Sequence, residues 1–463
     1  MSDLGVILLA AGLGKRMKSD LPKVLHLLGG KPLFWYPLKT AKSLRPGKIA
    51  AVVGHGADEI RRSCSEEKIE WVIQHQQLGT GHAVRCTKDL FEDFGGDLLI
   101  LNGDVPLISK ETLLALLRRH REAKATLTLL TAQLNQPYGY GRILRNGKKE
   151  IDSIVEERDA TDRQKEIKEV NAGVYAVPPR FLYTALEQLT GQNQQKEYYL
   201  PDIVRVALKN GNCVQTVPVN DAKEILGINT RQELAIMERT LQEKINQKWM
   251  ESGVTLKDPR TTYIEEEVLI GKDTVIGPNT HLLGRTAIGE RCRIDGNAYV
   301  TDTRLGNGVH LKFSVVLTDS RVDDDAIIGP FAHLRPGTSL GRSVHVGNFV
   351  ETKEATLGEG TKANHLSYLG DVTIGRETNI GAGAITCNYD GFKKYRTAIG
   401  DRVQVGSDST LVAPVSLGDD VYVATATTVR HEVPAGALVY NERREVLREG
   451  WTEKKRKKMG AKV

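Results

Sequence analysis

The first half of the chain alternates short apolar runs with longer segments in which apolar residues recur every three or four positions. The runs are VILLAAG at 6–12, IAAVVG at 49–54, WVIQ at 71–74, DLLILNGD at 97–104, ATLTLLTA at 125–132, VNAGVYAV at 170–177 and EILGIN at 224–229. Such runs predict strands, and intervening segments such as 110–123 predict helices. The alternation predicts an α/β domain with a mostly parallel sheet covered by helices. Ligands bind such sheets beyond the carboxyl ends of the strands, so we expect functional residues directly after the runs.

One long helix is predicted where this pattern ends. Thr230 is a residue type that caps helices, and Glu233 occupies the position from which an acidic side chain completes a capping box. Apolar residues follow with helical spacing at Leu234, Met237, Leu241 and Ile245. We therefore expect a linker helix at 231–251 between a domain at 1–230 and a domain at 252–463.

A different pattern begins near residue 268, where an aliphatic residue is repeatedly followed by glycine. These glycines are Gly271, Gly277, Gly289, Gly347, Gly375, Gly381, Gly400, Gly406 and Gly418. Spacings of 6 and 12 residues recur among them, and they indicate a parallel β-helix in which one aliphatic residue in six points into a narrow prism. Each coil buries its apolar residues only against its neighbours, so many coils must stack. A spacing of 19 between Gly381 and Gly400 breaks the period, and the segment CNYDGFKKYRT lies there. We expect this segment to leave the prism as a loop.

Composition narrows the class of protein. The 463 residues are 40% hydrophobic and 26% charged, as in ordinary globular proteins. No apolar run approaches the roughly 20 residues that span a bilayer, so we expect no membrane insertion. The opening MSDLGVILLAAGLGKRM lacks a basic segment before its apolar run and predicts a first strand, not a signal peptide. The five cysteines have no Cys-x-x-Cys spacing, which favours a reducing cytoplasm over a disulfide framework or a zinc site.

The charge of the chain is mild. The formal net charge is +6, and the clearest concentration of positive charge is the tail EKKRKKMGAK. A surface that stacks nucleic-acid bases needs aromatic residues among its basic residues, and the tail has none interleaved in this way. We interpret the tail as a solvated terminus and expect no nucleic-acid partner. Positive charge elsewhere suits small anionic substrates.

The opening LLAAGLGKRM predicts a strand that runs into a glycine-rich loop. It is not a Walker A motif, because no Lys-Ser or Lys-Thr follows the second glycine, and Met17 stands where a complete dinucleotide-binding fingerprint has its third glycine. Small residues in such a loop let backbone amides approach a phosphate, and Arg16 and Lys23 can neutralise a triphosphate. The alternative is a tight turn with surface basic residues.

Two further residues have chemically informative positions. Asp104 ends the buried run LLILNGDVP, where a carboxylate is either a hard oxygen ligand for magnesium or a helix cap. His365 lies in KANHLSYLGD. A histidine in a β-helix is either a packed scaffold residue or a general base, because imidazole titrates near neutral pH. The residues alone leave both alternatives open.

Together these motifs resemble one family. LAAGLGKRMKSDLPKVL, GTGHA, GDVP, NHLSYLGD and NIGAGAITCNYDG are similar to motifs of the bacterial bifunctional UDP-N-acetylglucosamine pyrophosphorylase and glucosamine-1-phosphate N-acetyltransferase. The similarity extends over essentially the whole chain. It implies a Rossmann-like nucleotidyltransferase domain, a linker helix and a left-handed parallel β-helix acetyltransferase domain. It also implies a cytoplasmic homotrimer with acetyltransferase sites between subunits.

For the first domain the resemblance implies a nucleotide-sugar site. The matching positions are Leu9, Ala10, Ala11, Gly12, Arg16 and Lys23 for the nucleotide, Gln74, Gly79 and Thr80 for the uracil side, Asn102, Gly103 and Asp104 at a strand end, Gly141, Glu156 and Asn171 for the sugar, and Asn229. Asp104 and Asn229, each expected at the end of a strand, would together hold Mg²⁺. Pro201 replaces a hydroxyl residue that usually follows the EYY segment at 197–199, which puts the geometry of that loop in question.

For the second domain the resemblance implies that His365 is the general base. The positions that match sugar-phosphate contacts are Arg335, Lys353, Tyr368 and Asn379, and those that match acetyl-CoA contacts are Ala382, Asn388, Tyr389, Ser407 and Thr425, with Lys394 in the nearby loop. Two positions depart from the family. Thr425 stands where an alanine is expected, and Glu442 stands where an arginine near the coenzyme phosphate is expected. Arg443 and Arg444 are candidates to replace that arginine.

The implied function has two steps. The enzyme would acetylate glucosamine 1-phosphate with acetyl-CoA and then transfer uridylyl from UTP to give UDP-N-acetylglucosamine and pyrophosphate, for cell-wall precursors. One alternative is a single-activity sugar-1-phosphate nucleotidyltransferase whose β-helix serves only oligomerisation, and Arg335, Lys353 and His365 together argue against it. Another is a non-enzymatic scaffold that has kept both domains, against which Asp104 and Asn229 argue.

Overall fold

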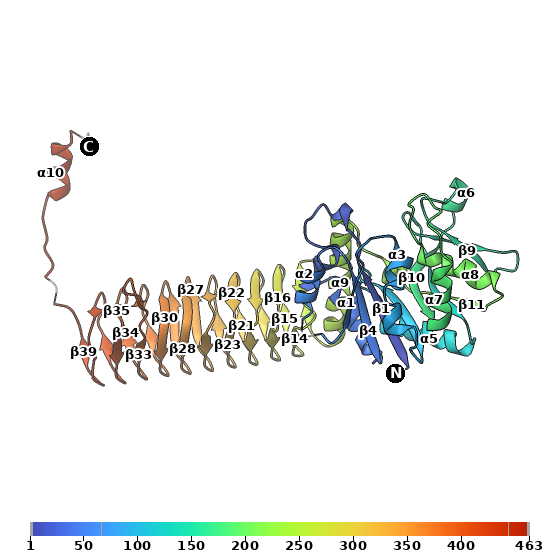
Figure 1. The fold of residues 1–463 in the computed structure, drawn as a ribbon. Coiled ribbons are helices and arrows are strands. Elements are labelled where there is room, and N and C mark those ends of the chain that lie inside the picture. The colour runs from blue at the N-terminus through green and yellow to red at the C-terminus, as the bar shows by residue number, and fades with distance from the viewer. Residues whose placement is uncertain (1–2, 66, 443, 461–463) are drawn as a thin grey trace. The chain divides into compact units, whose positions relative to one another are not determined.

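The boundary between the two parts of the chain falls inside one helix, α9 (Arg231–Glu251). The structure, a computed structural model, describes residues 3–65, 67–442 and 444–460 (Figure 1). It divides into two units, Met1–Leu241 and Gln242–Val463. The first unit is α/β and the second is a β-helix.

The first unit is built on one mixed sheet with the strand order β11-β7-β10-β6-β1-β4-β5 and a β8–β9 hairpin attached to β10. The strands are β1 (Leu4–Ala10), β4 (Lys48–Val53), β5 (Glu70–Ile73), β6 (Asp97–Asn102), β7 (Leu127–Gln133), β8 (Arg142–Arg145), β9 (Ile151–Val155), β10 (Glu169–Val177) and β11 (Val214–Pro218). β1 lies between β4 and β6 and is parallel to both. β10 is antiparallel to β6 and β7, so it departs from the parallel pattern.

Helices cover both faces of this sheet. They are α1 (Trp35–Ser43), α2 (Ala57–Ser63), α3 (Thr80–Arg85), α4 (Lys88–Phe91), α5 (Lys110–Glu122), α6 (Asp162–Lys165), α7 (Pro179–Glu187) and α8 (Ile203–Lys209). Neighbouring residues of β1 point to opposite faces, as in any strand. Val6 belongs to a core that includes Leu113 of α5, whereas Ile7 belongs to a second core that includes Leu182 of α7. Burial on both faces explains why the strands read as continuous apolar runs.

One predicted strand is wrong. EILGIN at 224–229 is a 3₁₀ turn, Ala222–Ile225, followed by a loop. The place beside β7 is taken by β11, which the apolar pattern did not predict. Ile225 and Ile228 are nevertheless buried. They are apolar because this turn and loop pack into the interior, and not because they form a strand. Asn229 therefore does not follow a strand.

The amino end of α9 carries the reciprocal bonds of a capping box. The Glu233 amide donates to Thr230 Oγ1 at 3.1 Å, and the Thr230 amide donates to Glu233 Oε2 at 3.0 Å. Within the first unit, Glu238 accepts a hydrogen bond from the Gly29 amide at 2.8 Å. Within the second unit, Asn246 Nδ2 donates to the Thr262 carbonyl at 2.9 Å. Each half of the helix is thus fastened within its own unit.

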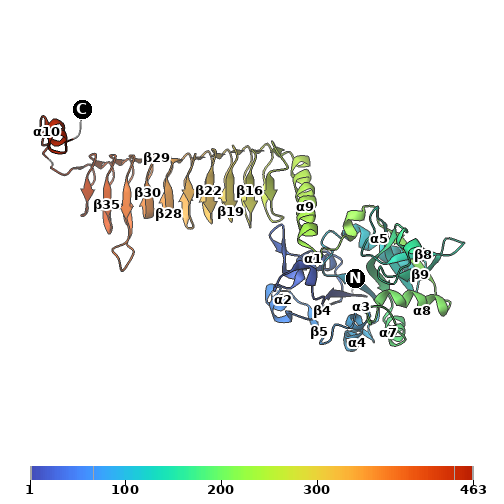
Figure 2. The same cartoon turned by 90° about the horizontal axis from the view of Figure 1, so that it is seen from above.

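The second unit is the expected left-handed parallel β-helix of hexapeptide repeats (Figures 1 and 2). Its described strands stack in parallel, and one stack runs from β12 (Thr255–Leu256) to β39 (Leu438–Val439). Paired residues in successive coils are mostly 17 or 18 apart, as for Val275 with Arg293 and His345 with Lys362. A Cβ on Gly271 would lie 2.5 Å from the Gly289 carbonyl carbon in the next coil, which explains glycine at this position.

One coil is longer than the rest. Asn379 of β31 (Asn379–Ile380) pairs with Gln404 of β34 (Gln404–Val405), a step of 25 residues. The extra residues form a small hairpin closed by an antiparallel bridge between Tyr389 and Lys394, as the broken period predicted. Gly381 lies against Gly406 in the neighbouring coil. The insertion therefore lengthens the spacing between these two glycines, and Gly400 is not the counterpart of Gly381.

Candidate active sites

The loop after β1 and the end of β6 form one edge of the sheet in the first unit. Leu9 pairs with Asn102, and the Gly103 amide donates to the Leu9 carbonyl at 2.8 Å. Ala10 and Ala11 are buried. Gly12 is exposed at the start of the glycine-rich loop, and Arg16 is exposed in the 3₁₀ turn Lys15–Met17 that ends it. The edge is therefore made of backbone and small side chains, as close approach to a nucleotide requires.

Gly14 lets the loop fold back against Lys23. Its φ is +60°, in the left-handed region that favours glycine, and a Cβ there would lie 2.8 Å from Lys23 Cβ. Lys23 begins the 3₁₀ turn Lys23–Leu25 and is partly buried. The glycine thus brings the lysine beside the strand ends.

Lys23, Asp104 and Asn229 meet at this edge. The Lys23 ammonium forms an ion pair with Asp104 and donates to Asn229 Oδ1 at 3.0 Å. The Ile228 amide donates to the Asp104 carbonyl at 3.1 Å, which holds the Asn229 loop against the end of β6. Two oxygens from distant parts of the chain therefore converge on one cationic group. A hard cation fits this donor set.

The uracil-side positions lie between β5 and α3. Gln74 follows β5 directly and is buried. Its Nε2 donates to the Gly79 carbonyl at 3.1 Å and contacts His82 Nδ1 at 2.9 Å. Thr80 begins α3, and its Oγ1 accepts a hydrogen bond from the Leu200 amide at 3.1 Å. Pro201 is accommodated within the 3₁₀ turn Leu200–Asp202, so it leaves this loop ordered.

Of the sugar positions, Gly141 directly precedes β8, Glu156 directly follows β9, and Asn171 lies in β10. The Asn171 amide donates to the Gly141 carbonyl at 2.9 Å, and a Cβ on Gly141 would lie 3.0 Å from Glu156 Oε1. Burial, with smaller contributions from Asp202 and Asp159, raises the pKa of Glu156 to about 7. Glu156, whose carboxyl changes charge near neutral pH, therefore lies beside Gly141, and the Gly141 backbone is in turn bonded to that of Asn171.

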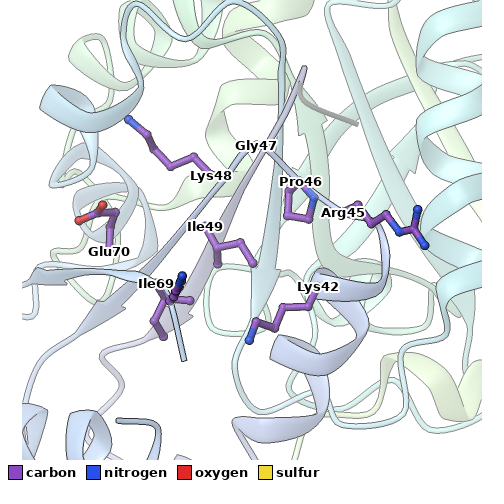
Figure 3. Close-up of a pocket in the computed structure, with 9 residues that line it drawn as sticks. Lys42, Arg45, Pro46, Gly47, Lys48, Ile49, Ile69 and Glu70 are labelled. Atoms are coloured by element: carbon purple, nitrogen blue, oxygen red, sulfur yellow. The ribbon is translucent and has the colours of Figure 1, made fainter. Parts of the chain in front are cut away.

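A separate basic pocket of about 530 Å³ lies at the amino ends of β4 and β5 (Figure 3). Lys42 there forms an ion pair with Glu67, and Lys48 Nζ donates to the Leu90 carbonyl at 3.1 Å. Its lining contains no predicted site residue. Ligands of α/β sheets bind at the carboxyl ends of the strands, so we do not assign a substrate to this pocket.

In the β-helix, His365 and Tyr368 flank one corner of a coil. His365 ends β29 (Lys362–His365), and Tyr368 begins β30 (Tyr368–Ile374). Leu366, with φ +45°, and Ser367 turn the corner, and Ser367 Oγ donates to the His365 carbonyl at 2.7 Å. The His365 side chain is exposed, and no hydrogen bond reaches its ring from the described residues of this chain. Asn379 lies on β31, the strand next to β29 in the same sheet, where it pairs with Lys362.

Positive charge gathers on the adjacent face. Arg335 and Lys353 lie in successive coils, and Arg335 Nη1 contacts Glu351 Oε1 at 2.7 Å. A hydrogen-bonding contact with Lys394, together with the charges of Lys394 and Arg335, lowers the pKa of Lys353. Three cationic side chains therefore repel one another here, and a phosphate dianion would relieve that repulsion.

The predicted coenzyme positions follow one corner of the β-helix. The Asp408 amide donates to the Ala382 carbonyl and the Ala426 amide to the Ser407 carbonyl, both at 2.7 Å. This register places Ala382, Ser407 and Thr425 at equivalent positions of successive coils. His365 occupies the same position one coil earlier.

The remaining coenzyme positions lie outside this column of equivalent corner residues, in the hairpin of the longer coil or in the segment after β39. Asn388 is buried and contacts Asp371, and Tyr389 is exposed at the base of the hairpin. Glu442 and Arg444 are exposed, and Arg443 lies outside the described residues.

Comparison with known proteins fits both units. The family model of the MobA-like NTP transferase domain matches residues 6–199, and models of bacterial transferase hexapeptide repeats and of the succinyl-transferase hexapeptide repeat match residues 267–302 and 396–429. The bifunctional protein GlmU of Geotalea uraniireducens is 47% identical over 98% of this chain and 100% of its own length. The GlmU proteins of Pelobacter propionicus and Synechococcus elongatus are each 46% identical, over 99% and 97% of this chain and 100% and 98% of their own lengths.

The chain belongs to the family of bifunctional GlmU proteins. The resemblance inferred from the sequence motifs is thereby confirmed. As a GlmU-family protein, the chain is a bifunctional enzyme, a uridylyltransferase and an acetyltransferase that uses a nucleoside triphosphate and acetyl-CoA. Among the described residues, no helix has the length and apolar character needed to cross a membrane.

Two residues beside the predicted sites were missed. His82 lies within the GTGHA motif but was not singled out, although its ring contacts Gln74. Arg142 is fully buried, forms an ion pair with Glu157 at 2.7 Å and lies next to Gly141. The motifs contain both residues, but a sequence does not show that a charged side chain is buried or which amide a histidine contacts.

Proposed function

We propose that the β-helix acetylates glucosamine 1-phosphate with acetyl-CoA, and that the first unit then joins N-acetylglucosamine 1-phosphate to the uridylyl group of UTP. The observation that carries this proposal is the presence of two separate polar clusters, one in each unit. Lys23, Asp104 and Asn229 converge at a sheet edge. In the other unit, His365 and Tyr368 flank a corner, and Tyr368 pairs with Glu351, two residues before Lys353 on the cationic face. Their chemistry suits phosphoryl transfer and acyl transfer respectively.

Uridylyl transfer would proceed by in-line displacement at the α-phosphorus of UTP. The attacking phosphate oxygen is already ionised, so the protein needs no general base. Arg16 and Lys23 would offset the negative charge that develops on pyrophosphate as it leaves. Gln74, Gly79 and Thr80 would hold the base, and Gly141, Glu156 and Asn171 would hold the sugar, so that the reacting atoms meet in line.

Magnesium fits the residues present. Asp104 and Asn229 offer a carboxylate and an amide oxygen that already converge on one cation, the Lys23 ammonium. Mg²⁺ commonly uses one or two protein ligands and completes its coordination with water and substrate phosphates. When bound, it would supply positive charge to the phosphates of UTP, and Lys23 would be free to contact them as well.

Acetyl transfer would depend on His365. A protonated amine is not a nucleophile, so His365 would accept a proton from the amine of glucosamine 1-phosphate as the nitrogen attacks the thioester carbonyl. Coenzyme A leaves as the carbon–sulfur bond breaks. Arg335 and Lys353 would hold the sugar phosphate, with Tyr368 and Asn379 at the sugar. Ala382, Asn388, Tyr389, Ser407 and Thr425 would line the coenzyme, as matched from the family.

We further propose a cytoplasmic homotrimer with no nucleic-acid partner. Exposed aromatic rings follow one another along one corner of the β-helix. Phe313 and Phe331 meet edge to face with centroids 6.4 Å apart, and Phe331 and Phe349 stack with centroids 5.3 Å apart. An exposed apolar stripe of this kind suits contact with another copy of the chain. The family resemblance supports three copies with acetyltransferase sites between them.

A coupled assay tests the two activities. Purified protein receives glucosamine 1-phosphate, acetyl-CoA, UTP and magnesium, and free thiol and pyrophosphate are measured separately. Both products are expected, and omission of magnesium should suppress pyrophosphate but not thiol. Release of pyrophosphate only when N-acetylglucosamine 1-phosphate is supplied would favour the single-activity alternative. The absence of both products would refute the proposed function.

A further inference from the structure

The two ends of the Gln74 carboxamide differ in their hydrogen bonding. The side chain is only 3% exposed, so its polar atoms must find partners. Nε2 contacts two groups, the Gly79 carbonyl at 3.1 Å and His82 Nδ1 at 2.9 Å. A carbonyl can only accept, so the amide end that faces Gly79 must be the nitrogen. Within the described residues, Oε1 has no such partner.

This orientation determines what His82 does. Nε2 carries two hydrogens, and the Gly79 carbonyl takes one of them. The other points to His82 Nδ1, which must therefore accept through a lone pair. His82 is then neutral, with its proton on Nε2. A protonated His82 would instead direct an N–H group against the N–H group of Gln74.

The surroundings of the ring favour this neutral form. Burial lowers the pKa of His82, and the positive charge of Arg85, on the same helix, lowers it further. A hydrogen bond with the backbone at Gln76 acts in the opposite direction but is the smallest of the three causes. A backbone carbonyl is the group whose hydrogen bond favours a ring N–H, which agrees with a proton on Nε2.

We propose that His82 is a positioning residue that, together with the Gly79 carbonyl, fixes the Gln74 amide so that Oε1, and not Nε2, is presented to the nucleotide base. This inference rests on the proposed function, in which Gln74 lies at the base of UTP. An acceptor at this position pairs with the N3–H group of uracil. Cytosine has a lone pair at N3, which Oε1 would repel. His82 would therefore determine base specificity without touching the nucleotide.

The test compares two substitutions of His82. His82→Asn places an amide oxygen near the position of Nδ1 and can still accept from Gln74, whereas His82→Leu cannot. The ratio of kcat/KM for UTP to kcat/KM for CTP is measured with N-acetylglucosamine 1-phosphate. We expect His82→Leu to lower this ratio roughly tenfold, the effect of losing one of the two hydrogen bonds that hold Nε2, so that only the Gly79 carbonyl keeps the amide in this orientation. His82→Asn should keep the ratio within about threefold of the unsubstituted protein.

His120 supplies the matched control. It is a buried histidine of the first unit, 3% exposed, and its Nδ1 contacts Thr128 Oγ1 at 2.9 Å, away from the predicted site. His120→Leu should reduce thermal stability without changing the UTP to CTP ratio. A ratio unchanged in His82→Leu, or equally lowered in His82→Leu and His82→Asn, would overturn the inference.

Binding separates this inference from the proposed function. Calorimetric titration with UTP and with CTP gives the same preference as a ratio of Kd values, with no turnover required. A protein that binds UTP over CTP but does not react with N-acetylglucosamine 1-phosphate would refute the proposed function and would still allow His82 to be tested. A protein that reacts, but shows the same Kd ratio with and without the His82 side chain, would refute only the inference.

Discussion

Asp104 and Asn229 both contact the ammonium group of Lys23, although they come from distant parts of the first unit. Asp104 follows a central strand, whereas Asn229 lies in the loop before α9. The contact between the Ile228 amide and the Asp104 carbonyl, 3.1 Å, keeps the two together. The cation-binding geometry therefore depends on a loop that is fastened to the end of β6.

Replacement of Asp104 by alanine should separate the two activities. Asp104→Ala removes the only charged oxygen of the proposed magnesium pair, so we expect uridylyl transfer to fall by about 10²-fold or more. Acetyl transfer should be unchanged, because His365 lies in the other unit. Pyrophosphate release and thiol release measured on one preparation check this. Asp152→Ala, at an exposed carboxylate on β9, is the control, and near-normal pyrophosphate release by Asp104→Ala would refute the metal assignment.

Replacement of His365 by alanine should give the reverse result. Loss of a general base typically costs about 10²- to 10⁴-fold in rate, so thiol release should fall by that factor while uridylyl transfer persists. Because the side chain is exposed, thermal stability should change little. His345→Ala, on the same sheet, should retain acetyl transfer. Wild-type thiol release, or a loss explained by unfolding, would return His365 to a structural role.

The sequence predicts the repeated elements well because each repeat depends on local rules. The glycine after an aliphatic residue, as at Gly271, is required by the contact with the next coil, and that contact recurs. The capping box of α9 is likewise a local pattern. The apolar run at 224–229 failed for the opposite reason. The sheet edge beside β7 is occupied by β11, a segment with weak apolar character, and the run itself forms a 3₁₀ turn and a loop.

The site positions show the same division. Asp104 follows from the rule that ligands lie beyond strand ends, and the family motifs suggest the other positions. Neither source indicates that His82 accepts from Gln74 or that Arg142 is buried beside Glu157. These are contacts between segments, and one sequence does not specify them. The sequence likewise does not show that the His365 ring has no hydrogen-bond partner among the described residues of the single chain.

The stability of the first unit should depend on pH through Glu156. This carboxyl ionises near pH 4.5 in an unfolded chain but has a pKa of about 7 in the folded protein. Between these values the folded state binds more protons. The stabilisation is therefore complete below about pH 4.5 and is lost as the pH rises through 7, by about 3 kcal/mol in total.

Calorimetric melting from pH 5.5 to 8.5 measures this dependence, followed in the transition that UTP shifts upward. Glu156→Gln keeps the shape of the side chain and cannot ionise, so the slope of melting temperature with pH should be reduced. Glu150→Gln, at an exposed position, should retain the slope. Equal slopes in Glu156→Gln and the unsubstituted protein would contradict the assignment.

The first unit should function alone only if it keeps the first half of α9. The sequence pattern predicts a domain at 1–230 and a linker helix at 231–251, and the two compact units divide within that helix, after Leu241. Arg231 contacts His26 Nδ1 at 3.1 Å, Glu238 accepts from the Gly29 amide at 2.8 Å, and Leu241 is 8% exposed. A fragment that ends at residue 230 loses all three interactions, at a cost of about 3–5 kcal/mol. That is a large share of the stability of an ordinary domain.

We therefore expect a fragment of residues 1–241 to fold and release pyrophosphate from UTP and N-acetylglucosamine 1-phosphate, and a fragment of residues 1–230 to melt at a markedly lower temperature. Two substitutions in the full-length chain isolate the reason. Leu241→Ala should destabilise the first unit by about 2 kcal/mol or more, because it removes a buried side chain. Ile236→Ala, on the same helix at a position that is 63% exposed, should change stability by less than about 0.5 kcal/mol. Equal melting temperatures of the two fragments, or a loss of stability in Leu241→Ala as small as that in Ile236→Ala, would show that the helix contributes nothing to the first unit.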